Sequence, residues 1–118
     1  MKFKFNEETP IYLQIIENIK TKIISKQYHV GEKLPSVRDF ALEFEVNPNT
    51  IQKSLAELEQ IGLILTDRTN GKYVTQNEEL INRLKSEMIS SNIQKFVFLM
   101  QEMGISKKEL IEIIIKEG

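Results

Sequence analysis

The chain has 118 residues, 41% of them hydrophobic and 28% charged, a balance that fits one compact domain with at most a small appendage and excludes wholesale disorder. It contains no cysteine, which excludes disulfide staples and thiolate metal sites. Its 16 Lys and Arg oppose 17 Asp and Glu, so the basic isoelectric point of many nucleic-acid binders is missing, although a local basic face is not excluded.

The first two predicted helices are marked by their starts. Thr9 followed by Pro10 is typical of a helix start, with a capping hydroxyl and proline at the first helical position. Apolar residues then recur with helical period as far as Ile24. Ser36, with Asp39 three residues later, predicts the start of a short second helix.

Asn47 followed by Pro48 predicts a third helix by the same signal, and Gly62 ends it as a C-terminal cap. Downstream, residues 63–66 and 72–75 are short runs of β-branched or aromatic side chains. Asn70-Gly71 lies between these runs and predicts a hairpin, because both residues tolerate positive φ.

Two more helices are predicted after the hairpin. Asn77 opens a long helical segment that stops at Gly104, and Ser106 with Glu109 forms a capping box for a final helix. The predicted fold class is therefore mainly α with a small β-hairpin wing. We expect a winged helix-turn-helix DNA-binding domain over residues 1–76 and a helical dimerisation extension over residues 77–118.

The third helix has the chemistry of a recognition helix. Its first two turns contain no acid, while Glu57 and Glu59 fall in its second half. A helix start donates free amides toward phosphate, Asn and Gln can bond base edges, and Lys can contact phosphate or guanine. The alternative is an ordinary polar helix start. The residues of these two turns include Asn47, Pro48, Asn49, Thr50, Gln52, Lys53 and Ser54.

Three further cations are candidates for contact with DNA. Arg38 lies near the start of the second helix, where its guanidinium can reach the surface formed by the third. The alternative for Arg38 is an ion pair with Asp39 or Glu43, although neither has ideal helical spacing. Arg68 and Lys72 flank the wing turn, where basic side chains would meet phosphate or a minor groove, and a solvated hairpin is their alternative.

Four segments between Thr9 and Val74 carry a family pattern: PIYLQ at 10–14, GEKLPSVR at 31–38, VNPNTI at 46–51 and LEQIGLI at 58–64. In this order and spacing they resemble the DNA-binding domain of GntR-type bacterial transcriptional regulators. The short two-helix tail is similar to the small YtrA-like subfamily. The resemblance implies a dimeric regulator of a nearby operon, often one encoding an ABC transporter. Repression is the expected mode, because a small bound dimer can block polymerase by occupancy.

The resemblance also implies roles for individual residues on DNA. Arg38 would meet the DNA backbone or a base. The third helix would enter the major groove, and the wing tip would approach the minor groove. The residues implied on this helix and wing tip are Asn47, Asn49, Thr50, Gln52, Lys53, Asn70 and Gly71.

The sequence departs from the family pattern at two positions. Lys26 stands where many members have glycine after the first helix. Pro48 occupies a position where some relatives have arginine, so a direct base contact there is lost. Base choice is then left to the flanking Asn49 and Gln52.

Residues 77–118 carry too many apolar side chains for a solvated extension and are too few for a separate ligand-binding domain. The run at 96–100 is apolar on more than one face of its helix, so one face can pack within the subunit and another against a second copy. We expect a two-fold dimer that reads two half-sites about 34 Å apart, the alternative being that the last helix alone covers the apolar face. The expected dimer residues are Leu84, Met88, Phe96, Leu99, Met100, Ile111, Ile114 and Ile115.

The sequence also bears on other classes of function. An enzyme is not expected, because His29 has no nucleophile or paired carboxylates near it, and with no phosphate-binding glycine loop or metal-ligand cluster no cofactor or metal is expected either. A winged-helix module for protein contact without DNA binding is the alternative function. Without an apolar run long enough to cross a membrane or a signal-peptide pattern, a cytoplasmic protein is expected. Control by a small-molecule effector stays open.

Overall fold

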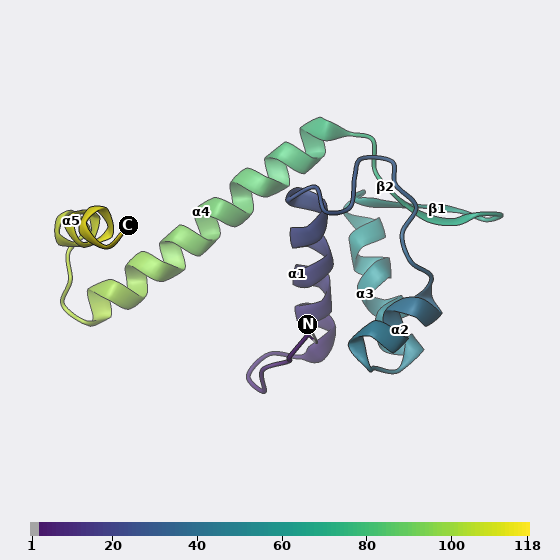
Figure 1. The fold of residues 1–118 in the computed structure, drawn as a ribbon, viewed down its shortest axis with the longest axis horizontal. Helices are drawn as coiled ribbons and strands as arrows, with labels where there is room; N and C mark the ends of the chain where they lie inside the picture. The colour runs from purple at the N-terminus through teal and green to yellow at the C-terminus, as the bar shows by residue number, and fades with distance from the viewer. Residues whose placement is uncertain (1–2) are drawn as a thin grey trace. The chain divides into compact units, whose positions relative to one another are not determined.

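The computed structural model describes residues 3–118, and this range contains five helices and one two-stranded antiparallel sheet (Figure 1). Met1 and Lys2, which begin the predicted DNA-binding domain, lie outside the described residues. The predicted order of three helices, a hairpin and two helices is confirmed. The elements are α1 (Ile11–Ile24), α2 (Val37–Phe44), α3 (Pro48–Gln60), β1 (Ile64–Asp67), β2 (Gly71–Val74), α4 (Glu78–Glu102) and α5 (Lys107–Glu117).

The chain divides into two compact units, one ending at Asn82 and the other covering 83–118. The division falls inside α4, whose first turn belongs to the first unit. Asn77 caps this helix by accepting a hydrogen bond from the amide of Leu80 at 3.1 Å, and Ile81 is buried. The start of α4 therefore completes the first unit, while the rest of the helix belongs to the second.

Side-chain caps fix the starts of α2 and α3. The Ser36 hydroxyl accepts a hydrogen bond from the amide of Asp39 at 3.1 Å. Asn47 Oδ1 accepts one from the amide of Asn49 at 2.8 Å, and Pro48 follows at the first helical position. These bonds satisfy amides that the helices cannot pair internally, and both predicted starts are confirmed.

The start of α1 corrects the prediction. The helix begins at Ile11, one residue after Pro10, and Thr9 does not cap it. Instead, the Gln14 side chain reaches back along the chain. Its Nε2 donates to the carbonyls of Thr9 at 2.7 Å and Asn6 at 2.9 Å, and its Oε1 accepts from the amide of Asn6 at 2.9 Å. A long amide side chain one turn into the helix thus holds the entering segment, where a short hydroxyl was expected to do so.

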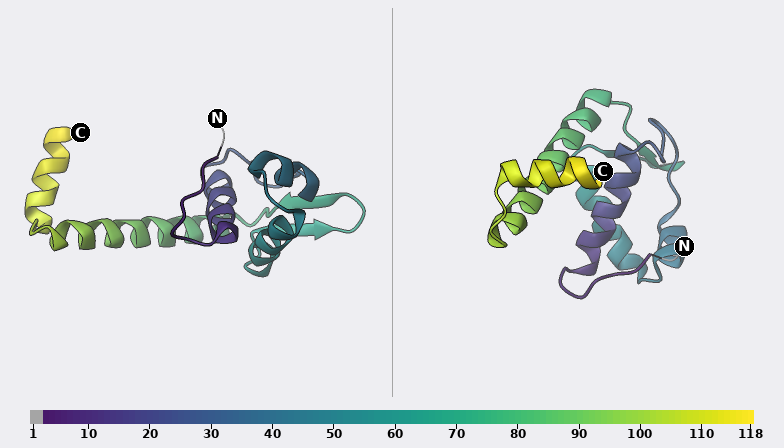
Figure 2. Two further views of the ribbon diagram at one scale, coloured as in Figure 1. Left: turned by 90° about the horizontal axis from the view of Figure 1, so that it is seen from below. Right: turned by 60° about the vertical axis from the view of Figure 1, so that its left-hand side comes forward.

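The core of the first unit lies between α1, α2, α3 and the hairpin (Figures 1 and 2). α3 is its central element, since it packs against α1, α2 and β1. Complete burial of one such apolar side chain stabilises the fold by about 1.5–3 kcal/mol. The largest fully buried apolar side chains are Phe40, Ile15, Ile19, Ile23, Ile51, Leu55, Leu58, Leu63, Ile64 and Val74.

The predicted hairpin is confirmed, and one of the two residues of its Asn-Gly signal takes positive φ. Asp67 pairs with Gly71, so residues 68–70 form a three-residue loop. Gly71 has a φ of 103°, whereas Asn70 does not take the positive φ expected of it. Asp67 explains the difference, because its carboxylate accepts hydrogen bonds from the amide of Thr69 at 2.9 Å and from the Asn70 side chain at 3.2 Å. The wing therefore ends in a three-residue loop held by the Asp67 side chain, with positive φ at the glycine that follows it.

The segment between α1 and α2 extends the sheet beside β2. Lys33 forms a β-bridge with Tyr73, and the amide of Leu34 donates to the carbonyl of Lys72 at 2.8 Å. The side-chain pattern of residues 31–34 gives no strand signal, so this contact was not predicted. It fixes the base of the wing to the turn that precedes α2.

Lys26 follows α1 with a left-handed backbone, φ 66°. Its amide donates to the carbonyl of Ile23 at 3.1 Å, and the amide of Tyr28 donates to the carbonyl of Lys22 at 3.1 Å. Glycine adopts this conformation most easily, which is a physical reason for the glycine that the family pattern has here. The lysine forms the turn nonetheless, so the departure at residue 26 leaves the fold intact.

The second unit consists of the rest of α4 together with α5. Gly104, with a φ of 83°, follows α4, and the Ser106 hydroxyl accepts a hydrogen bond from the amide of Glu109 at 3.2 Å. Both features are as predicted. Among residues 83–118, Leu110 is the one buried side chain. This unit therefore has secondary structure with very little core.

Candidate DNA-binding surface and apolar tail

The start of α3 presents the polar groups that were predicted to meet DNA. Asn49, Gln52 and Lys53 are exposed. Asn47 is exposed too, although its side-chain oxygen serves as the helix cap, and Thr50 is half-buried. The first turn of α3 holds no acid, so the positive end of the helix dipole is not offset there. This end of α3 can accept an anion.

Arg38 is the second residue of α2, which packs against α3. Its side chain is exposed, and within residues 3–118 no carboxylate forms an ion pair with it. The two acids considered as partners are otherwise placed: Glu43 pairs with Lys22 at 3.8 Å, and Asp39 lies in the first turn of α2. The guanidinium charge of Arg38 is therefore available to bind an anion.

The wing tip carries one cation and one anion. Arg68 and Asn70 are exposed in the loop. The hydrogen bond from the amide of Thr69, followed by that from the Asn70 side chain, lowers the pKa of Asp67 below its usual value. Asp67 therefore stays ionised at neutral pH and offsets part of the charge of Arg68. The wing is less positive than its arginine alone indicates.

Lys72 is already engaged within the chain. Its ammonium bonds the carboxylate of Glu59 on α3 and donates to the Thr66 hydroxyl at 3.0 Å. Desolvation alone would raise the pKa of Glu59, but hydrogen bonds from Lys72 and Thr66 and the lysine charge outweigh it and lower the pKa. The pair fastens the wing to the far half of α3. Of the predicted cations, Lys72 is the one that the structure neutralises.

Lys33 is a cation near the wing that sequence reasoning did not select. It is exposed, it bridges Tyr73 on β2, and its Cε would lie 3.6 Å from a Cβ placed on Gly71. Its side chain therefore runs beside the start of β2. The signal that could have found it is its position inside the GEKLPSVR segment, between the first and second helices.

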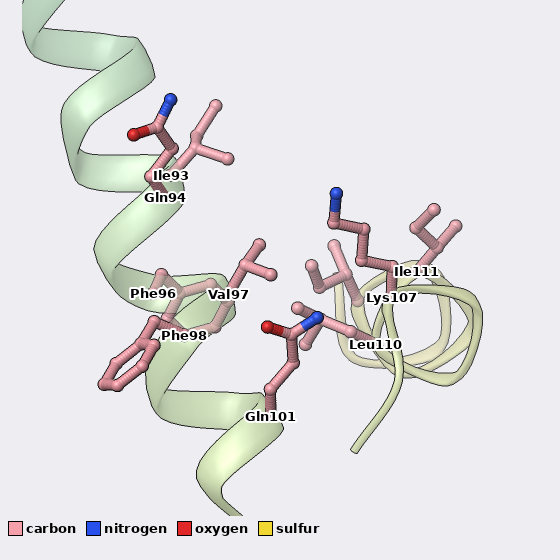
Figure 3. A pocket seen from close by; sticks show the side chains of 10 residues that line it. Ile93, Gln94, Phe96, Val97, Phe98, Gln101, Lys107, Leu110 and Ile111 are labelled. Atoms are coloured by element: carbon pink, nitrogen blue, oxygen red, sulfur yellow. The ribbon is translucent and has the colours of Figure 1, made fainter. Parts of the chain in front are cut away.

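The second unit contains an apolar groove of about 690 Å³ between the later turns of α4 and α5 (Figure 3). Val97 and Gln101 of α4 face Leu110 of α5 across it (Figure 3). Lys107 supplies the one charged side chain of the lining. Its apolar lining is formed by Ile93, Phe96, Val97, Phe98, Leu110, Ile111 and Ile114.

The predicted dimer residues are all accessible to some degree. Phe96, Leu99, Ile111, Ile114 and Ile115 are exposed, and Leu84, Met88 and Met100 are intermediate. Phe98 and Met103 are exposed as well, at 60% and 68%, but were not among those predicted. Helical periodicity could not single out Phe98, because the 96–100 run is apolar on several faces. α5 leaves much of this apolar surface uncovered.

Two further observations concern other kinds of site. No helix in the described part of the chain is long and apolar enough to cross a membrane. Residues 3–118 also contain no group of three or more His, Asp or Glu side chains placed to hold a metal ion.

Comparison with known protein families identifies the family to which this fold belongs. Residues 11–74 match the family model described as bacterial regulatory proteins, gntR family, which spans the elements from α1 to β2. The chain belongs to the GntR family. It is a DNA-binding transcriptional regulator with a winged helix-turn-helix, as the sequence resemblance implied.

Similar GntR proteins support this assignment along most of the chain. The chain is 38% identical to the HTH-type transcriptional regulator YhcF of Bacillus subtilis, over 95% of this chain and 93% of that protein. It is 36% identical to the transcriptional repressor YtrA of the same organism, over 88% and 81%. A GntR family transcriptional regulator from Listeria monocytogenes is similar in structure, with a TM-score of 0.89, 39% identity and coverage of 95% and 98%. The resemblance to the YtrA-like subfamily is thereby supported.

Proposed function

We propose that the chain is a repressor that binds a palindromic operator as a homodimer and controls a nearby operon. The observation that carries this proposal is the start of α3, where Asn49, Gln52 and Lys53 are exposed and no acid lies in the first turn. Amide side chains can bond the edges of bases in the major groove, and the helix start favours phosphate. The repressor role is supported by similarity to YtrA, which is a repressor. An operon for an ABC transporter is the first target to examine, on the resemblance to the YtrA-like subfamily.

Each part of the surface has a role in this proposal. Asn49 and Gln52 read bases, while Asn47, Thr50 and Lys53 contact the flanking backbone. Arg38, unpaired among the described residues, binds phosphate or a base from α2. The wing approaches the minor groove with Arg68, Asn70 and Gly71. Lys72 is given a supporting role, because its charge is balanced by Glu59.

The dimer is proposed to form through α4 and α5. Large exposed apolar side chains in one segment are a liability unless a partner covers them. Two subunits related by a two-fold axis would place two recognition helices on two half-sites, which is what a palindromic operator needs. Covering the groove beside Phe96 and Ile111 would also supply the core that the second unit lacks.

Charge balance sharpens the need for two subunits. Residues 1–75 hold ten basic and ten acidic side chains, so the DNA-binding part is neutral overall. Non-specific binding depends on the number of phosphates neutralised, so a single subunit should hold DNA weakly. Engagement of two half-sites multiplies affinity without any new contact. Binding to DNA also implies a cytoplasmic site of action in a bacterium, and no catalysis is included in the proposal because the relatives are regulators.

The test begins by selecting bound fragments from the source genome, which names the operator and its neighbouring genes together. Affinity for the selected duplex and for a random duplex is then measured by fluorescence anisotropy over a range of salt concentrations. We expect affinity for both to fall with added salt, and affinity for the selected duplex to be higher throughout. An affinity that does not change with salt would leave only a protein-contact module.

A matched pair of glutamines tests the orientation of α3. Gln52 and Gln60 are both exposed on this helix, at its start and its end. Gln52→Ala should weaken binding to the selected duplex by about 1–3 kcal/mol and leave the random duplex nearly unaffected. Gln60→Ala should change neither affinity. Equal effects of the two substitutions would contradict a recognition role for the start of α3.

A further inference from the structure

Lys53 is held by an aromatic ring from another helix. Its ammonium lies 3.8 Å from the centroid of the Tyr12 ring, well within the range of a cation–π contact. Tyr12 is half-buried in the first turn of α1, whereas Lys53 is exposed on the second turn of α3. The lysine side chain therefore leans from the recognition helix toward the start of α1.

The two helices are joined at the same place by a buried hydrogen bond. Ser54, the neighbour of Lys53, is fully buried, and its hydroxyl donates to the carbonyl of Tyr12 at 3.1 Å while also facing the carbonyl of Thr50 at 2.9 Å. The backbone positions that carry the ring and the lysine are thus fixed relative to each other. The packing of α1 against α3 thus places the Lys53 side chain within reach of the Tyr12 ring.

The chemistry of this contact differs from that of the other paired lysines. Lys20, Lys22, Lys26 and Lys72 each have a carboxylate partner, so their charge is partly neutralised. Within residues 3–118, no carboxylate pairs with Lys53. An aromatic face holds a cation without cancelling its charge and without using an acceptor atom. The ammonium therefore remains able to bind an anion.

The pair also borders the other residues at the start of α3. A shallow depression of about 370 Å³ is lined by Ile11, Tyr12, Asn49, Thr50 and Lys53. Three of these, Asn49, Thr50 and Lys53, are proposed above to meet DNA. A phosphate at the edge of the groove that receives α3 would lie against this depression. The first turn of α1 is thereby part of the surface that α3 presents.

We propose that Tyr12 is a positioning residue for DNA binding: its ring holds the Lys53 ammonium in place for a backbone phosphate beside the recognition helix. This rests on the proposed role of α3. A free lysine loses rotamer freedom when it binds, and a lysine that is already held loses less. Tyr12 therefore raises affinity through Lys53 and makes no contact with a base.

The test uses the full chain, a duplex selected by it from a random-sequence library, and a random duplex of equal length. Lys53→Met should weaken binding to both duplexes and make the salt dependence shallower by about one ion per subunit. Tyr12→Leu removes the ring and should weaken binding about 3- to 10-fold, as expected when one side chain must be ordered on binding. Tyr12→Phe keeps the ring and should bind like the wild type.

The structure offers a matched control. Lys22 lies over the Tyr28 ring at 5.9 Å in the same unit, on residues outside the proposed DNA surface. Tyr28→Leu should leave affinity for DNA unchanged. Because Tyr12 is half-buried, thermal melting of Tyr12→Leu is compared with that of Tyr12→Phe. The chemical shifts of the Lys53 Cε protons provide a measurement on the wild type itself, since a ring beneath them moves these signals upfield.

The outcomes separate the inference from the function on which it rests. If the Lys53→Met variant binds DNA as well as the wild type, Lys53 does not contact DNA, and that part of the proposed function is wrong. If Lys53→Met weakens binding and Tyr12→Leu does not, the inference alone is overturned. The inference is also overturned if Tyr12→Leu weakens binding by the same factor in the Lys53→Met background as in the wild type. The same holds if the Tyr12→Phe variant binds as weakly as the Tyr12→Leu variant. Lys53 signals without an upfield shift would overturn it even if the leucine variant failed to fold.

Discussion

The two compact units of the chain use apolar residues in opposite ways. In the first unit the large apolar side chains of α1, α2 and α3 meet one another, and Phe40 and Leu58 are 0% exposed. In the second, Ile115 is 75% exposed and Leu110 is the one buried side chain among residues 83–118. Burial of apolar surface stabilises a fold by about 25 cal/mol per Å². This contribution is therefore large in the first unit and small in the second. One unit is therefore complete as a fold, whereas the other exposes the apolar surface that the proposed dimer would cover.

The largest expected effect comes from breaking the proposed dimer. Phe96→Glu places a charge on the uncovered face of α4 and should give a monomer whose operator affinity is about 100- to 10,000-fold weaker, because the two half-sites are no longer linked. Light scattering coupled to size-exclusion chromatography measures the mass, and anisotropy measures the affinity. Ile61→Glu is the control, since Ile61 is similarly exposed, at 41% against 45% for Phe96, but lies in the first unit. A dimer that survives both Phe96→Glu and Met100→Glu would refute the tail assignment.

A second experiment compares the two units by stability. Leu58→Ala, in the core of the first unit, should lower the free energy of unfolding by about 2–5 kcal/mol. Ile115→Ala, tested in the Phe96→Glu background so that no dimer contributes, should change it by less than about 0.5 kcal/mol. Urea denaturation followed by circular dichroism gives both values. A loss of several kcal/mol on Ile115→Ala would mean that the second unit has a core of its own.

Arg38→Ala tests function without touching the core. Its side chain is exposed and has no ion pair within residues 3–118, so we expect operator binding to weaken by about 1–3 kcal/mol while the melting temperature stays within a few degrees. Arg83→Ala, which removes an exposed arginine paired with Glu87 at 3.9 Å in the second unit, should have little effect on either. A large loss of stability on Arg38→Ala would make Arg38 a structural residue.

The smallest expected effect concerns the base of the wing. Lys72 and Thr66 lower the pKa of Glu59 below its ordinary 4.5, so this contact stabilises the fold above that pH and is lost as the pH falls through the lowered value. Glu59→Gln should therefore cost less than about 1 kcal/mol at pH 7, as is usual for a partly exposed pair. The difference from wild type should vanish in strong acid. A difference that is constant between pH 7 and pH 2 would assign the effect to packing.

The features that sequence reasoning predicted are those set by neighbours along the chain. Ser36 and Asn47 cap helices through amides two or three residues away, so their roles follow from local chemistry. The same reasoning predicted a cap at Thr9 and was wrong, because the Gln14 side chain, from inside α1, bonds the backbone that enters the helix. At the wing, the Asn-Gly signal placed the hairpin correctly, but Asn70 does not take positive φ, and its side chain is bonded to Asp67 just before the loop. Local signals thus predict roughly where an element begins. They do not predict which of two nearby polar side chains bonds the backbone there.

The contacts that sequence reasoning missed join residues distant along the chain. Lys33 bridges Tyr73, and Lys72 pairs with Glu59 across the base of the wing. Neither follows from periodicity, because each depends on how the hairpin packs against α3 and the loop before α2. The apolar tail was easier to foresee, since an excess of apolar side chains is visible in composition. Which of them face a partner is still a prediction, because a helix apolar on several faces has no single preferred side.

The turn after α1 shows how a departure from a family pattern can cost almost nothing. A lysine held at φ 66° is disfavoured by about 1–2 kcal/mol relative to glycine. Glycine would in turn give the unfolded chain more freedom, worth about 0.4–1 kcal/mol, and would lose the 3.6 Å ion pair between Lys26 and Glu78, worth about 0–1 kcal/mol. These terms nearly cancel. Glycine and lysine are therefore nearly equivalent for stability at this position, so the side chain there can carry a charge at almost no cost to the fold.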